Sequence, residues 1–106
     1  MGYKEAINEI VETLKAKYKP EKIILFGSCV WGRITRDSDI DMLIIKNTNK
    51  SYPQRWLEVC HLTRDLKRTI PFEPYILTHK EMRREMNRNL FLQEILRKGK
   101  ILYEKS

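Results

Sequence analysis

The strongest constraint on the fold is a pair of short apolar runs, residues 22–26 and 40–45, joined by a polar segment that begins at Gly27 and ends at Asp39. Each run has the length of a strand and is bounded by turn-forming residues. A strand sends alternate side chains to the same face of its sheet. The sequence therefore predicts two buried strands joined by a loop or a short helix, with Asp39 and Asp41 on one face.

Apolar periodicity predicts the remaining elements. A 3.6-residue period indicates helices, and apolar runs bounded by turn residues indicate strands. The helix 52–69 is expected to have Pro53 in its first turn and one apolar face made by Trp56, Val59, Cys60, Thr63 and Leu66. The predicted helices cover about residues 3–18 and 52–69, a segment that starts at the capping box 78–81, and a segment from about 90 to 99, while strands are expected at 72–77 and in a short extension at 101–103.

Composition limits the class of protein. With 42% apolar and 33% charged residues, the chain has enough of both to fold as one domain. No apolar run approaches the roughly 18 residues of a membrane span, and the segment 1–19 is amphipathic and contains acids, unlike a signal peptide. We therefore expect no membrane contact and a cytoplasmic location. Cys29 and Cys60 are too few for a disulfide framework and have no zinc-ligand spacing with His61 or His79.

The net charge of +7 favours partners that carry phosphate groups. Residues 79–106 hold eight lysines or arginines against four glutamates. Because these charges are interleaved, they are more typical of a solvated helix face than of a nucleic-acid surface. We expect no nucleic-acid partner, although binding of RNA or DNA by this basic third stays open as an alternative.

Asp39 and Asp41 are candidate metal ligands. Two residues apart on one face of a strand, they lie roughly 7 Å apart along the backbone, a span that their side chains can close around a divalent cation. Two half-buried carboxylates this close repel each other unless a cation or hydrogen-bond donors compensate them. Oxygen ligands without His or Cys favour Mg²⁺ or Mn²⁺, which commonly bridge to substrate phosphates.

The residues before this acidic pair are suited to holding phosphate. Gly27 allows the backbone to approach an anion, and Ser28 offers its N–H and hydroxyl at the start of a predicted short helix. Gly32 is expected to let that helix pass close over the sheet. Arg33 and Arg36 supply guanidinium groups that can neutralise phosphate charge.

These two groups of residues form a combined motif. The pattern G-S-x-x-x-G at residues 27–32, followed by S-D-I-D at residues 38–41, resembles the signature of nucleotidyltransferases in the DNA polymerase beta superfamily, and the size of the chain resembles their minimal branch. The resemblance implies one domain over residues 1–106 with an α/β (α+β) fold, a mixed sheet flanked by helices. It also implies that the two aspartates bind two Mg²⁺ ions, that the first motif holds a nucleoside triphosphate, and that Ser38 belongs to the nucleotide-binding residues.

The resemblance implies a third carboxylate on the following strand, where this sequence has Glu73. Glu73 is therefore predicted to be a catalytic residue and metal ligand beside Asp39 and Asp41, with an ordinary exposed strand acid as the alternative. Pro74 removes a backbone donor, which suits an edge strand. Trp31 stands where many relatives have Arg, and either stacks on a ligand or packs against the fold.

The resemblance also implies a reaction and a partner. The expected reaction moves AMP from ATP to an acceptor hydroxyl. Minimal nucleotidyltransferases look like one half of two-gene modules whose other half is a helical HEPN-type protein, often a toxic RNase. This chain would be the antitoxin that adenylylates a tyrosine of that partner. The alternative is a non-catalytic protein that neutralises its partner by complex formation, and a homo-oligomer also stays open.

Overall fold

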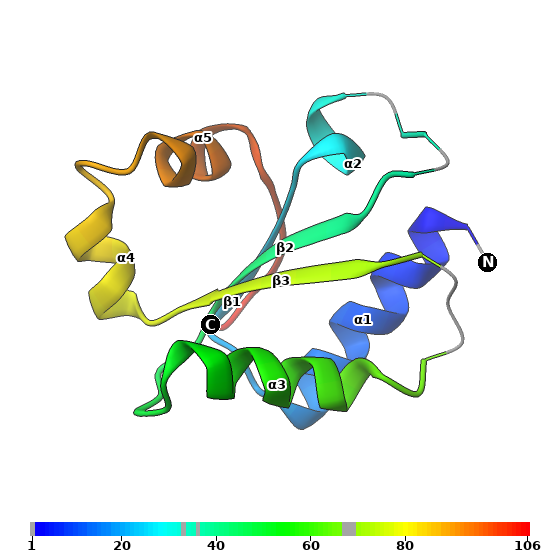
Figure 1. The fold of residues 1–106 in the computed structure, drawn as a ribbon, viewed down its shortest axis with the longest axis horizontal. Coiled ribbons are helices and arrows are strands. Elements are labelled where there is room, and N and C mark those ends of the chain that lie inside the picture. The colour runs from blue at the N-terminus through cyan, green and yellow to red at the C-terminus, as the bar shows by residue number, and fades with distance from the viewer. Residues whose placement is uncertain (1, 33, 36, 67–69) are drawn as a thin grey trace.

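The computed structural model describes residues 2–32, 34–35, 37–66 and 70–106. These residues form a four-stranded sheet with strand order β3-β2-β1-β4 and with helices on both faces (Figure 1). The strands are β1 (Lys22–Phe26), β2 (Ile40–Ile45), β3 (Phe72–Leu77) and β4 (Lys100–Glu104).

Helices separate the strands along the chain. None of those formed by the described residues combines the length and the apolar character needed to pass through a lipid bilayer. The helices are α1 (Tyr3–Lys17), α2 (Ser28–Trp31), α3 (Tyr52–Thr63), α4 (His79–Glu85) and α5 (Leu90–Lys98).

The sheet is mixed, as the resemblance implied. β1 pairs antiparallel with both β2 and β4, whereas β2 pairs parallel with β3. A parallel pair needs a long crossover connection, and α3 provides it between β2 and β3. β3 and β4 are the two edge strands, so Pro74 lies on an edge, where a missing backbone donor is tolerated.

The two faces of the sheet bury separate apolar layers. α1 and α3 cover one face, and α4 and α5 lie over the other (Figure 1). Ile40 and Met42 of β2 pack in the layer with α1 and α3, whereas Leu43 and Ile45 pack in the layer with α5. All four side chains are fully buried. Because side chains alternate along a strand, Asp41 faces the same side as Leu43.

The predicted helix 52–69 is wrong at its end, and its predicted buried face is right for Val59 and Thr63 but wrong for Trp56. α3 ends at Thr63, a turn follows, and residues 67–69 lie outside the described part of the chain. The helix buries Arg55, Val59 and Thr63, while Trp56 is 38% exposed. The apolar pattern alone placed Trp56 inside because nothing local reveals that an arginine is the buried residue.

Arg55 is buried because Glu81 neutralises it. Its guanidinium donates to both carboxylate oxygens of Glu81, at 2.7 and 3.1 Å, and its Nε donates to the carbonyl of Lys50 at 2.8 Å. Glu81 also accepts from the backbone N–H of Thr78 at 2.9 Å, which completes the predicted capping box at the start of α4. This ion pair lowers the pKa of Glu81 below its ordinary value. It therefore joins α3 to α4 across the end of β3.

We expect Glu81→Ala to lower the free energy of unfolding by about 3 kcal/mol, because it leaves the buried Arg55 charge without a partner and removes a helix cap. Urea denaturation at pH 7 measures the change. Glu94→Ala is the control, since Glu94 pairs with Lys98 on an exposed surface, and it should change the stability far less than Glu81→Ala. Equal losses in the two variants would contradict a special role for the Arg55 pair.

Candidate functional site

The predicted acids gather at the end of the sheet where β1 finishes and β2 and β3 begin. Phe26, the last residue of β1, lies opposite Asp41 in the antiparallel pair, and Asp41 lies beside Glu73 in the parallel pair. Asp39 precedes β2 by one residue, so the pleat directs it to the same face as Asp41. Asp39 and Asp41 are half-buried, whereas Glu73 is exposed. Asp41 is therefore the central acid of the site.

Gly27 shapes the other side of Asp41. Its φ of +80° is a conformation that side-chain-bearing residues rarely adopt, and a Cβ at this position would collide with the carboxylate of Asp41. The carbonyl of Gly27 accepts from the N–H groups of Val30 and Trp31, at 3.0 and 2.8 Å, and so closes the first turn of α2. Ser28 begins α2 directly after this contact. The predicted strand-to-helix junction therefore lies against the central acid.

The three acids act on one another electrostatically. Burial raises the pKa of Asp41 from its ordinary value of 3.8 to about 6, with further contributions from the negative charges of Asp39 and then Glu73. The charged form of Asp41 is thus disfavoured in the folded protein. Among the described residues, burial and both neighbouring carboxylates act against ionisation of Asp41.

The donor set fits a cation shared between protein and substrate. Carboxylate oxygens without His or Cys ligands match Mg²⁺ or Mn²⁺, and Mg²⁺ is usually held by one or two carboxylates together with substrate phosphates. Within the described part of the chain, no three His, Cys, Asp or Glu side chains are arranged so that they could hold a metal ion by themselves. Asp39 and Asp41 are therefore suited to a shared site, and Glu73 does not complete a preformed cage with them.

Ser38 supports the loop before Asp39. Its side chain is buried, and its hydroxyl accepts from the backbone N–H of Thr35 at 2.8 Å. The phenol of Tyr3 donates to the carbonyl of Ser38 at 2.7 Å and so fastens this loop to α1. The hydroxyl of Ser38 thus has a partner within the loop. Its predicted role in nucleotide binding stays a prediction. Sequence reasoning missed Tyr3, since no local pattern links two residues 35 positions apart.

The structure corrects the reading of Gly32. This residue is exposed and extended, and a Cβ there would meet none of the described residues within 4 Å, so Gly32 does not serve a close passage of α2 over the sheet. Arg33 and Arg36, the predicted phosphate-neutralising residues, lie outside the described residues. Their roles stay predictions.

Aromatic side chains border the acids on the same face of the sheet. Trp31 packs against Phe26, with ring centroids 6.0 Å apart, which supports its packing role, while stacking on a ligand stays untested. The row continues from Phe26 to Phe91 and from there through Tyr75 to Tyr52, with centroids 5.6, 6.5 and 6.3 Å apart. It runs from α2 across the face to the outer edge of β3.

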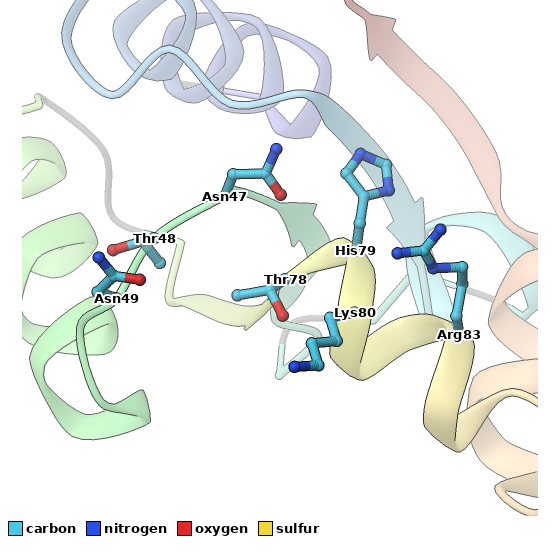
Figure 2. A pocket seen from close by; sticks show the side chains of 7 residues that line it. All are labelled: Asn47, Thr48, Asn49, Thr78, His79, Lys80 and Arg83. Carbon is cyan, nitrogen blue, oxygen red and sulfur yellow. The ribbon is translucent and has the colours of Figure 1, made fainter.

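A separate polar pocket lies at the opposite end of β2 and β3 (Figure 2). It has a volume of about 510 Å³. Figure 2 shows His79 and Arg83 extending to one side of α4 and Lys80 to the other, so Lys80 and Arg83 do not converge on one point. Because the acids lie at the other end of these strands, this pocket is not part of the candidate site. Its lining residues are Asn47, Thr48, Asn49, Thr78, His79, Lys80 and Arg83.

One protein family matches a region of this chain that includes the whole candidate site. Residues 8–106 match the family described as Polymerase beta, Nucleotidyltransferase. The matched region contains all three acids and the junction at Gly27 and Ser28.

Individual proteins give the same result. Two similar proteins of Methanocaldococcus jannaschii are both named "Putative protein adenylyltransferase". The first is 32% identical over 97% of this chain and 100% of its own length. The second is 33% identical over 74% of this chain and 77% of its own length. A crystal structure titled "putative nucleotidyltransferase" is 31% identical, with a TM-score of 0.59 over 92% of this chain and 97% of its own. A spectinomycin adenyltransferase of Enterococcus faecialis, crystallised with ATP and spectinomycin, has a TM-score of 0.70 over 99% of this chain. At 16% identity that last likeness shows the fold alone, and this chain spans 57% of its length.

We expect Gly27→Ala to lower the free energy of unfolding by about 1–3 kcal/mol, because the new methyl group enforces a strained backbone and displaces the Asp41 carboxylate. Thermal or urea unfolding measures the loss. Gly32→Ala is the matched control, since its extended backbone and open surroundings should keep the change within about 0.5 kcal/mol. The close contact at Gly27 would be refuted by equal stabilities.

We expect Asp41→Asn to stabilise the metal-free protein above pH 6. The pKa of Asp41 is raised on folding, so its ionisation destabilises the fold progressively from about pH 4 to pH 6, and the penalty is absent at lower pH. After allowance for solvent screening, the gain at pH 7.5 should be about 1–2 kcal/mol. Unfolding in EDTA at pH 7.5 and at pH 3.5 tests this, and an equal effect at both values would contradict it.

Proposed function

The chain belongs to the polymerase beta family of nucleotidyltransferases, and on that premise we propose that it transfers AMP from ATP to a hydroxyl group of a partner protein. The observation that carries the proposal is the position of Asp41, between the glycine-serine junction on one side and Glu73 on the other. The names of the two relatives, which are both putative protein adenylyltransferases, support a protein acceptor and AMP as the transferred group.

The proposed reaction is an in-line displacement at the α-phosphorus. The acceptor oxygen forms a bond to this phosphorus, the bond to the bridging oxygen of pyrophosphate breaks, and the hydroxyl proton leaves. Incoming and leaving oxygens must lie on opposite sides of the phosphorus. We assign the side of Gly27 and Ser28 to the triphosphate and the side of Glu73 to the acceptor, where its exposed carboxylate accepts the proton.

We propose that Asp39 and Asp41 hold divalent metal, two Mg²⁺ ions by resemblance to the family, with Mn²⁺ as a substitute and Glu73 as a further ligand. Burial, with the added negative charges of Asp39 and Glu73, raises the pKa of Asp41, and a bound cation would offset these effects, which supports the assignment. When bound, such ions stabilise the negative charge of the phosphates and lower the pKa of the acceptor hydroxyl. Asp41 on β2 and Asp39 one residue before it direct their carboxylates to one face of the sheet, where they would hold such ions beside the α-phosphate.

The partner we propose is a HEPN-type helical protein, with this chain as the antitoxin of a two-gene toxin-antitoxin pair. This part rests on resemblance to minimal nucleotidyltransferases and on the protein acceptor in the names of the relatives. Modification of a tyrosine hydroxyl would add a nucleotide and its negative charge to the partner.

One observation favours a second candidate, neutralisation of the partner by complex formation without chemistry. Among the described residues no three acids form a metal-holding group, and Glu73 is exposed. Inhibition of the partner that survives Asp39→Asn and needs no nucleotide would support this function instead.

We expect Asp41→Asn to lower AMP transfer by about a thousandfold or more, since it removes charge at the centre of the site at nearly constant shape. The measurement is transfer of ³²P from α-labelled ATP, with Mg²⁺, into proteins of the source-cell lysate. A protein labelled by the wild-type chain alone, and not after EDTA treatment, is the expected result. Equal labelling by wild type and Asp41→Asn would refute the proposed catalytic centre.

A further inference from the structure

The outer edge of the sheet is the open approach to the acids. β3 is an edge strand, and Glu73 on it is exposed and lies beside Asp41. On the other side of Asp41, Gly27 lies against the carboxylate and α2 begins, and this is the side assigned to the triphosphate. An incoming group opposite the phosphate side must therefore reach Asp41 past β3.

A groove lies along this edge, between β3 and α3. Its volume is about 460 Å³, and α3 runs beside β3 in Figure 1. Three of its apolar side chains are exposed, Tyr52 by 40%, Trp56 by 38% and Leu57 by 61%. Exposed apolar side chains that gather in one place commonly mark an interaction surface. The lining residues are Tyr52, Pro53, Trp56, Leu57, Glu73 and Pro74.

The groove has features of a preformed recognition surface. Pro53 and Pro74 restrict the backbone on its two walls. The ring of Tyr52 packs edge-on against Tyr75, with centroids 6.3 Å apart, and Tyr75 belongs to the buried layer on the face of the acids. Tryptophan and tyrosine dominate the energetics of many protein interfaces because they bury much area at a small entropic cost. The groove is thus anchored to the same layer that borders the active face.

Charge selects the class of acceptor. Among the described residues that line the groove, Glu73 is the one charged side chain, and lysine and arginine are absent. Nucleic acids bind chiefly through cationic side chains that neutralise their phosphates, so a groove with a single negative charge disfavours the end of an RNA or DNA strand. A polypeptide segment with apolar side chains around its hydroxyl matches this lining.

We infer that this groove is the docking site of the acceptor protein, which places apolar side chains against Trp56 and Leu57 and presents its hydroxyl to Glu73. The inference rests on the proposed function and adds the acceptor surface to it. It assigns the two sides of Asp41 to two substrates, the nucleotide at Gly27 and the polypeptide at Glu73.

The test compares Leu57→Arg with wild type and with Ile101→Arg. Leu57 is exposed on α3, and Ile101 is 52% exposed on β4 at the opposite edge of the sheet, so both variants place a charge on the surface and should fold normally. Circular dichroism confirms folding, and titration with a fluorescent ATP analogue measures nucleotide affinity. We expect all three proteins to bind the analogue within about twofold of one another.

We expect Leu57→Arg to label the acceptor with α-³²P AMP about tenfold less than wild type, and Ile101→Arg to label it normally. A photoreactive p-benzoylphenylalanine at position 57, but not at position 101, should cross-link to the same protein that receives the label. Normal labelling by Leu57→Arg, or a cross-link from position 101 alone, would overturn the docking site and leave the proposed function intact. If the wild-type chain labels no protein, the proposed function is wrong and the docking site falls with it.

Discussion

The antiparallel pairing of β1 with β2 is the constraint on which the candidate site depends. Its register sets Phe26 opposite Asp41, and the chain then turns at Gly27 directly against the Asp41 carboxylate. A slip of one residue would turn every side chain of β2 to the other face and bury Asp41 in the layer under α1 and α3. The fully buried Ile40 and Met42 prevent that slip, because they would have to exchange places with acids.

The same packing that orders the site also makes it electrostatically unfavourable. Apolar strands hold Asp41 half-buried beside two other acids, and its pKa rises to about 6 as a result. An unfavourable charge of this kind persists only where the rest of the structure is stable enough to hold it, and strongly shifted pKa values are concentrated at functional sites. Here the buried layers on both faces of β2 supply the stability, while the acids are kept ready for positively charged ligands. Gly27 on one side and Glu73 on the other then give Asp41 two distinct neighbours, which is the basis of its proposed two-substrate role.

Most secondary-structure elements follow from local patterns. The strands 22–26, 40–45 and 72–77 have the predicted bounds, and the capping box at 78–81 starts a helix as expected, because a strand period or a cap is decided within a few residues. The exception is α3, whose end was predicted too late and whose predicted buried face included Trp56 and missed Arg55. Arg55 is buried because it pairs with Glu81, which lies 26 positions later. A prediction from the apolar periodicity of α3 cannot include that ion pair, because Glu81 lies outside the helix.

The sequence by itself determined the strands 22–26, 40–45 and 72–77 and the shared face of Asp39 and Asp41, since alternation along a strand is a local geometric rule. Only the tertiary structure decided which neighbours these residues have. The pairing of strands brings Glu73 beside Asp41, and the close passage of Gly27 past its carboxylate depends on the register between β1 and β2. The hydrogen bond from Tyr3 to the carbonyl of Ser38 likewise could not be predicted from the sequence. Contacts between distant residues arise from the packing of whole elements, and no short window of sequence contains that information.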